Sequence, residues 1–219
     1  MEDKKAFLGT APVGKLLLRL ALPTVVAQLI NMLYNIVDRI YIGHIPEIGG
    51  AALTGVGLFT PIPGVEVYAP ESYRELDAVL ETAVQSDNIS VIRYPRGSEI
   101  EYDRGVWQEI ADGITAADFP GNTDGKPLVI LTYGRIAYEA LRAAAEIFLT
   151  RPVRVIRLNK IYPLKKENIL SAVGGAECCL IVEEGMRRGG IGEMIAAILA
   201  ESGKPIRVKI LAAADFVPH

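Results

Sequence analysis

The chain has 219 residues, of which 50% are hydrophobic and 22% are charged, and its formal net charge is −3 at pH 7. This length allows one domain with a hydrophobic core, or one domain with an appended segment. The charge is slightly negative and no stripe of Lys and Arg with interleaved aromatic residues occurs, so nucleic-acid binding is not expected. The high hydrophobic fraction beside an ordinary charged fraction indicates one apolar segment joined to one ordinary globular segment.

Residues 20–37 form an uncharged apolar stretch that is just long enough to cross a hydrocarbon core as a helix. Basic residues precede it, which would leave the N-terminus in the cytoplasm. Pro23 would kink this helix near its start. Amide side chains interrupt the stretch and need hydrogen-bond partners in lipid. The face of the helix that carries them is therefore expected to contact other helices or a water-filled cavity. We therefore predict membrane insertion of residues 16–42.

Asp38 lies at the far end of this stretch, beside Arg39, and is either an interfacial neighbour of that arginine or a functional carboxylate. Residues 9–58 resemble the opening of a multidrug and toxic compound extrusion (MATE) transporter, chiefly through "LALP", "LYNIVDRIYIG" and "ALTGVGL". The resemblance implies that Asp38 belongs to a cation or proton site and that Pro23 lies at a bend. Such transporters need many helices in two lobes, so transport does not follow from one helix.

From Gly64 onward the apolar pattern alternates between strand and helix periods. It predicts strands at 65–69 and 89–94, with a helix between them whose start has Ser72 and Glu75 in capping-box spacing. After a polar, Gly- and Asp-rich stretch, a second series of elements follows. These are strands 127–133, 153–158, 178–183 and 206–211, and helices 135–148, 167–172 and 190–202. The order predicts an α/β fold with a parallel-rich sheet covered on both faces.

The two cysteines, Cys178 and Cys179, are adjacent on a predicted strand and so point to opposite faces. No CxxC spacing or nearby histidine accompanies them, which favours plain strand residues in a reducing compartment over a redox or metal pair. The sequence predicts no metal site.

Glycines precede the last predicted helix in "EEGMRRGGIGEM", at Gly189, Gly190 and Gly192. Glycines ahead of a helix N-terminus can cradle an anion. The dinucleotide spacing G-x-G-x-x-G is absent, however, which favours a tight strand-to-helix turn over an anion loop. Both an anion loop and a turn stay open.

The second predicted strand ends in "RYPRG", residues 93–97. Arg93 and Arg96 would present two guanidinium groups at the carboxyl edge of a sheet, where open α/β folds place their ligands. Arginine suits a phosphate because its donors form a fork. The alternative is a pair of surface ion pairs.

The segments "IPGVEVYAPESYRELDAVL", "ISVIRYPRG", "PLVILTYGRIAYEAL", "RVIRLNKIYPL", "CCLIVEEGMRRGGIGEMIA" and "ADFVPH" occur in the order found in another family. They resemble the C-terminal half of 1-deoxy-D-xylulose-5-phosphate synthase, a transketolase-type enzyme that uses thiamine diphosphate and magnesium. The resemblance implies condensation of pyruvate with glyceraldehyde 3-phosphate in isoprenoid biosynthesis. It also implies that Arg96 holds the aldehyde's phosphate and that Arg93, Tyr94 and Gly97 shape the loop.

The parts of that family which hold the cofactor, the metal and the catalytic glutamate have no counterpart in the 219 residues. We therefore expect no catalytic residue, no bound thiamine diphosphate and no synthase activity from this polypeptide alone. The C-terminus, at "FVPH", also stops where the family usually continues. Together the two resemblances divide the chain into four parts. These are a transporter-like helical segment (1–60), a remnant of a pyrimidine-binding domain (61–97), a linker (98–126) and a transketolase C-terminal-like three-layer α/β/α domain (127–219).

The leading hypothesis is thus a truncated or chimeric synthase fragment, with a seam near "LFTPI" at residues 58–62. Recombination, gene decay or a misjoined sequence would each produce such a seam. One alternative is a membrane-anchored interaction module, and another is a fragment of a MATE-type antiporter. We expect residues 61–219 to be cytoplasmic and to contact a second copy or a synthase subunit through the C-terminal domain, with membrane association only through residues 16–42.

Overall fold

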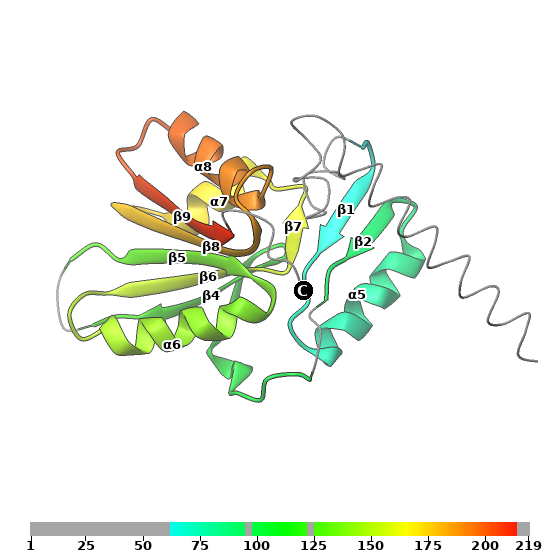
Figure 1. Cartoon of the computed structure of the whole chain (residues 1–219), viewed down its shortest axis with the longest axis horizontal. Coiled ribbons are helices and arrows are strands. Elements are labelled where there is room, and N and C mark those ends of the chain that lie inside the picture. Colours follow the sequence, from blue (N-terminus) through cyan, green and yellow to red (C-terminus); the bar gives the residue numbers. More distant parts are fainter. Residues whose placement is uncertain (1–61, 95–97, 122–124, 214–219) are drawn as a thin grey trace, which may run out of the picture. The chain divides into compact units, whose positions relative to one another are not determined.

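The computed structural model describes residues 62–94, 98–121 and 125–213 (Figure 1). The chain divides into two units, residues 1–49 and 50–219, and every described residue belongs to the second. The transporter-like segment, with Pro23 and Asp38, lies outside the described residues, as does the predicted membrane segment 16–42. Among the helices that are described, none has the length and apolarity needed to span a bilayer.

A six-stranded mixed sheet forms the larger part of the described fold, in the order β3–β4–β6–β5–β8–β9. The four strands β6, β5, β8 and β9 are parallel to one another, whereas β4 is antiparallel to both β6 and β3. The strands are β3 (Gln108–Ala111), β4 (Ile114–Phe119), β5 (Leu128–Tyr133), β6 (Val153–Leu158), β8 (Cys178–Met186) and β9 (Arg207–Ala213). The predicted parallel-rich α/β sheet is confirmed, with an antiparallel hairpin added at one edge.

Helices cover this sheet on both faces, because successive side chains of a strand point to opposite sides. The helices are α6 (Ala137–Ile147), α7 (Lys166–Val173) and α8 (Ile191–Glu201). Leu131 of β5 joins a core with α7 and α8, while its neighbour Ile130 joins a second core with α6. Figure 1 shows α6 on one side of the sheet and α7 and α8 on the other. The α/β/α layering was predicted from the alternating elements alone.

A smaller three-stranded sheet has the order β2–β1–β7. Its members are β1 (Val65–Tyr68), β2 (Ile89–Ile92) and β7 (Lys160–Tyr162), and helix α5 (Tyr73–Gln85) connects β1 to β2. β1 and β2 are parallel, and β7 pairs with β1 in the antiparallel sense. The sequence did not predict β7, a strand of three residues that follows β6 after one intervening residue. It pairs with β1 and so joins the larger sheet to the smaller one.

The stretch that was predicted as a linker, residues 98–126, contains a 3-10 turn (Arg104–Val106) and the β3–β4 hairpin. The stretch thus carries regular secondary structure within residues 104–119, and its place between two domains stays a prediction. β3 is largely exposed and β4 has alanines at two of its three buried positions, so neither strand has a strong hydrophobic signal. The missed signal is Asp112–Gly113, a pair typical of two-residue hairpin turns, with Gly113 at φ 69°.

Candidate functional site

The carboxyl ends of β5 and β8 lie side by side, because the two strands pair in parallel register. From β5 the chain continues to α6 on one face of the sheet, and from β8 it continues to α8 on the other. Open α/β sheets bind their ligands in the crevice where two such connections diverge. This edge is therefore the candidate site.

Glu183 of β8 is buried at this edge, with 3% of its surface exposed. Its carboxylate accepts hydrogen bonds from the amides of Ile191 (3.1 Å) and Gly192 (3.2 Å) at the start of α8. A negative group at this position complements the partial positive charge of a helix N-terminus. Burial raises the pKa of Glu183, and the two amides oppose that rise. The first amides of α8 thus already have a hydrogen-bond acceptor within the chain.

The predicted glycines are explained by this carboxylate. A Cβ on Gly190 would lie 2.6 Å from the Oε1 of Glu183, and a Cβ on Gly192 would lie 2.7 Å from the same atom. Gly189 adopts φ 71°, in the left-handed region that favours glycine. The geometry favours a strand-to-helix turn built around Glu183.

Arg93 follows β2 and reaches the same edge of the larger sheet. Its Nη1 donates to the hydroxyl of Tyr133 (2.9 Å), and its guanidinium lies over the Tyr133 ring, 5.2 Å from the centroid. The Tyr133 hydroxyl donates in turn to Oε2 of Glu183 (3.3 Å). Burial raises the pKa of Tyr133, so the phenol stays protonated. The structure thus links Arg93 to the glycine turn, two features that the sequence presented separately.

Sequence reasoning missed both Tyr133 and Glu183. Each lies at or near the end of a predicted buried strand, and a polar group there needs a partner. That was the available signal. Arg96 and Gly97 lie outside the described residues.

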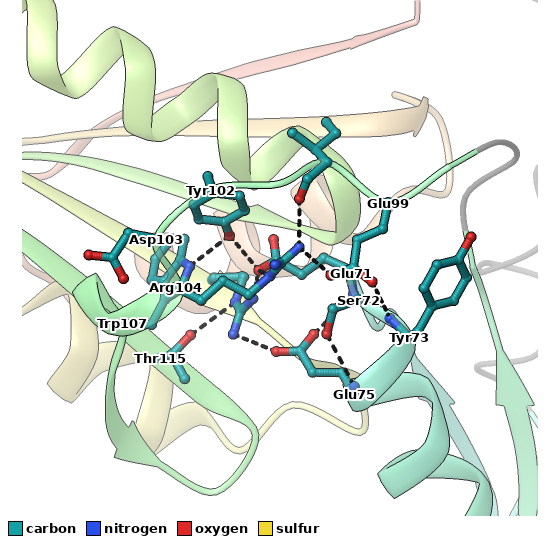
Figure 2. Close-up of polar contacts among 12 residues, drawn as sticks. Glu71, Ser72, Tyr73, Glu75, Glu99, Tyr102, Asp103, Arg104, Trp107 and Thr115 are labelled. Carbon is teal, nitrogen blue, oxygen red and sulfur yellow. Dashed lines mark hydrogen bonds and ion pairs between the residues drawn. The ribbon is translucent and has the colours of Figure 1, made fainter.

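A second polar cluster joins the start of α5 to the larger sheet (Figure 2). We call it the Glu71–Arg157 cluster. Its members are Glu71, Glu75, Glu99, Tyr102, Arg104, Trp107, Thr115 and Arg157. Arg157 is buried near the C-terminal end of β6, pairs with Glu71, and contacts Glu75 Oε1 at 2.8 Å. Its guanidinium also lies over the Trp107 ring, 4.7 Å from the centroid.

Glu71 is the centre of the Glu71–Arg157 cluster. It accepts from the Tyr102 hydroxyl and lies 3.5 Å from Nε of Arg104. Burial raises the pKa of Glu71, and the charge of Arg157 opposes the rise. The predicted cap at Ser72 is confirmed, since its Oγ accepts from the Glu75 amide (3.1 Å), but the Glu75 carboxylate returns to the Glu71 amide (3.0 Å). Every charge in this cluster has a partner, so we assign it a structural role.

Cys178 and Cys179 lie in β8 and are free thiols. Burial raises the pKa of Cys179 to about 12, so it stays a thiol at neutral pH. In the part of the chain that the structure describes, no three His, Cys, Asp or Glu side chains gather closely enough to hold a metal ion.

Residues 121–219 match the family of the transketolase C-terminal domain. The chain is 31% identical over 184 residues to 1-deoxy-D-xylulose-5-phosphate synthase of Halothermothrix orenii, which covers 78% of this chain and 28% of that protein. It is 32% identical over 151 residues to the mitochondrial 2-oxoisovalerate dehydrogenase subunit beta of Chaetomium thermophilum, covering 66% of this chain and 31% of that protein. The chain thus spans less than a third of the length of these curated relatives.

Among solved structures, the chain resembles a split gene transketolase described as an inactive beta4 tetramer, with a TM-score of 0.55 and 21% identity. The alignment covers 73% of this chain and 51% of that one. At this identity the likeness shows the fold alone. The described sheet is therefore a mixed α/β sheet like that of the transketolase C-terminal domain, which supports the resemblance of residues 61–219. The matched family begins at residue 121 and gives no support to the transporter-like reading of residues 1–60.

Proposed function

We propose that residues 61–219 are the C-terminal part of a 1-deoxy-D-xylulose-5-phosphate synthase and bind the phosphate of an aldehyde substrate. The observation that carries this proposal is the position of Arg93. Its guanidinium is held at the carboxyl edge of the sheet by Tyr133, where α/β folds bind ligands. The identity with curated synthases, at 31% in one relative, supports the same assignment.

Arg93 keeps donors for a ligand. Only Nη1 is used by Tyr133, and the nearest carboxylate to Nη2, that of Glu184, is 3.9 Å away. An arginine has five N–H donors and prefers two-pronged contacts to phosphate oxygens. Arg96, three residues further on, lies outside the described residues, and its role as the principal phosphate ligand rests on the synthase resemblance.

The test is isothermal titration of the full chain with glyceraldehyde 3-phosphate and with inorganic phosphate. We expect binding that weakens about tenfold in Arg96→Lys and in Arg93→Lys, because lysine cannot form the two-pronged contact. Arg142→Lys is the matched control, since Arg142 is exposed on α6 and contacts Glu139 and Tyr138 of the same helix. Equal affinities in all four proteins would reject the proposed phosphate site.

The parts of the synthase family that hold thiamine diphosphate and magnesium have no counterpart in the 219 residues. Among the described residues, no three His, Cys, Asp or Glu side chains gather closely enough to hold a metal ion. We therefore derive no catalytic step through the cofactor and infer that this polypeptide alone has no synthase activity. Calorimetry with thiamine diphosphate and magnesium tests this inference, and binding in the micromolar range would contradict it.

A second candidate function is that of a 2-oxo acid dehydrogenase beta subunit, favoured by the 32% identity to one such subunit. The two candidates differ in their ligands. A synthase part should prefer glyceraldehyde 3-phosphate, whereas a dehydrogenase part has no reason to prefer a phosphate. Competition between glyceraldehyde 3-phosphate and 2-oxoisovalerate in the same titration separates them.

For residues 1–60 we propose a separate origin, as the first helix of a MATE-type transporter, with Asp38 as the remnant of its cation site. Residues 16–42 would then anchor the chain in a membrane, and the whole would be a membrane-anchored interaction module or a chimera. Fractionation after expression decides this point. Recovery in the membrane pellet after a carbonate wash supports an anchor, and recovery in the supernatant rejects it.

We also propose that residues 127–219 mediate association with a second copy or with a synthase subunit. The fold neighbour described as a tetramer supports this idea. Sedimentation velocity of the full chain in detergent should show a species larger than the monomer. A monomer at micromolar concentration would reject self-association.

A further inference from the structure

Three side chains from distant parts of the sequence meet at the candidate site. Arg93 follows β2, Tyr133 ends β5, and Glu183 lies in β8. The Tyr133 hydroxyl is at their centre, since it accepts from Arg93 Nη1 (2.9 Å) and donates to Glu183 Oε2 (3.3 Å). We propose that Tyr133 and Glu183 are positioning residues that fix the Arg93 guanidinium for an anionic ligand. The ligand part of this inference rests on the proposed function.

The two positioning residues are held firmly. Both Tyr133 and Glu183 have only 3% of their surface exposed. Glu183 is fixed by two amides of α8, those of Ile191 and Gly192, and a carboxylate with several donors has little freedom to rotate. The Tyr133 phenol therefore has one favourable direction, with its hydrogen toward Glu183 and its oxygen lone pair toward Arg93. The Arg93 guanidinium is thus linked to the start of α8 through Tyr133 and Glu183.

Arg93 is restrained at both of its ends. Its backbone amide donates to the carbonyl of Tyr68 in β1 (2.8 Å), and its guanidinium is bound by Tyr133. The cation also lies over the Tyr133 ring face, 5.2 Å from the centroid, which adds an attraction to the same residue. A guanidinium held before the ligand arrives loses less side-chain freedom on binding. The Tyr133 hydroxyl should therefore contribute to affinity without touching the ligand.

The chain offers a matched pair of variants at adjacent positions of β5. Tyr133→Phe removes one buried hydroxyl that belongs to the network. Thr132→Val removes one from the neighbouring residue, which is fully buried and whose Oγ1 has no hydrogen-bond partner among the described residues. Thr132 points to the opposite face of the sheet, because adjacent strand residues alternate. Both variants lose a hydroxyl from the same strand, and only one loses the contact to Arg93.

The first measurement does not depend on any ligand. Nuclear magnetic resonance of the full-length chain, with labelled arginine and Arg93 assigned through Arg93→Lys, reports rotation of the guanidinium group. We expect rotation to be at least about fivefold faster in Tyr133→Phe than in the wild type, because a charged hydrogen bond is lost. Thr132→Val should match the wild type. Unchanged rotation in Tyr133→Phe overturns the positioning role.

The second measurement is titration of the same proteins with glyceraldehyde 3-phosphate. Tyr133→Phe and Glu183→Gln should each bind on the order of tenfold more weakly, and Thr132→Val should bind as the wild type does. Equal affinities in Tyr133→Phe and the wild type would overturn positioning for the ligand. A wild-type chain that binds no phosphate compound rejects the proposed function instead, and guanidinium rotation still decides whether Tyr133 fixes Arg93.

Discussion

Helices α5 and α8 each follow a strand and each have an apolar face, but their surroundings are very different. α8 buries Ile191, Ile195 and Leu199 in a core shared with the larger sheet. α5 buries no residue at all, and Val84 on its surface is 87% exposed. The periodicity of a helix therefore shows which face is apolar, and it does not show that a partner for that face is present.

The two regions are also held together in different ways. The larger sheet is stabilised by apolar cores on both faces. The β1–α5–β2 region contributes Val65 and Val67 of β1 to one of these cores, and it is otherwise attached through the pairing of β1 with β7 and through the Glu71–Arg157 cluster. One edge of β1 is thus covered by β7, whereas β2 is an edge strand with a free side among the described residues. We infer that the smaller region depends on the larger one for its stability.

Arg157→Ala should destabilise the β1–α5–β2 region more than any other change considered. It leaves the buried Glu71 carboxylate without its main counter-charge, and we expect a loss of about 3–5 kcal/mol of unfolding free energy. Hydrogen exchange should accelerate across residues 65–92 first, while β5 and β8 stay protected. Arg154→Ala is the control, because Arg154 lies on the same strand as Arg157. Its ion pair with Asp118 of β4 is half exposed and should contribute under about 1 kcal/mol to the free energy of unfolding. Equal losses in the two variants would contradict a structural role for the cluster.

The contrast between the two helices can be measured directly with matched truncations. Ile195→Ala in α8 removes a fully buried side chain and should lower the unfolding free energy by about 2–4 kcal/mol, as for other large-to-small core changes. Val84→Ala in α5 should change it by less than about 0.5 kcal/mol. Urea denaturation of both variants gives the two values. A large loss in Val84→Ala would show that α5 is covered in solution.

The turn before α8 provides a smaller test within the larger sheet. Gly192→Ala places a methyl group 2.7 Å from the Glu183 carboxylate, so the carboxylate must shift away from the amides it binds. We expect a loss of about 1–3 kcal/mol, typical of overpacking. Gly175→Ala is the matched control, because nothing lies within 4 Å of its added Cβ. Thermal unfolding that is the same in both variants would reject the explanation of the glycines by Glu183.

The sequence predicted the larger region better than the smaller one, for a physical reason. The strand "PLVILTY" is buried on both faces and carries a continuous apolar run, and apolar residues form most of "VRVIRL" and "CCLIVE" as well, so β5, β6 and β8 were placed correctly. β7 has three residues and β3 is exposed, so tertiary pairing rather than local pattern determines them. Arg157 gave a signal that could have been used, since a charge inside a buried strand requires a partner.

The candidate site was predicted only in part, because its contacts join residues far apart in the chain. The turn residues Gly189, Gly190 and Gly192 were identified from spacing, and Arg93 from its place at the end of a strand. Their connection through Tyr133 and Glu183 requires the strand order of the sheet, which no local pattern contains.

The smallest expected effect concerns how the unfolding free energy depends on pH. The contributions of Glu183 and Glu66 should change with pH in opposite directions. Burial raises the pKa of Glu183 in the larger sheet above its ordinary value of 4.5, so the folded chain holds that proton more tightly than the unfolded chain does. Its contribution to stability is fully present below pH 4.5 and is lost as the pH rises through the folded pKa. The hydrogen bond with Lys160 lowers the pKa of Glu66 at the β1–β7 joint. That contribution is present above pH 4.5 and is lost as the pH falls through the folded pKa.

Glu183→Gln should therefore flatten the decline in unfolding free energy on the alkaline side of pH 4.5, and Glu66→Gln should flatten the decline on the acid side. Urea denaturation between about pH 3 and pH 7 would measure both curves against the wild type. Each glutamine keeps the shape of the side chain and removes its titration, so the two difference curves should have opposite slopes. Slopes of the same sign would mean that the pKa values of the two carboxylates shift in the same direction. That outcome would contradict the opposite effects expected from burial at Glu183 and from Lys160 at Glu66.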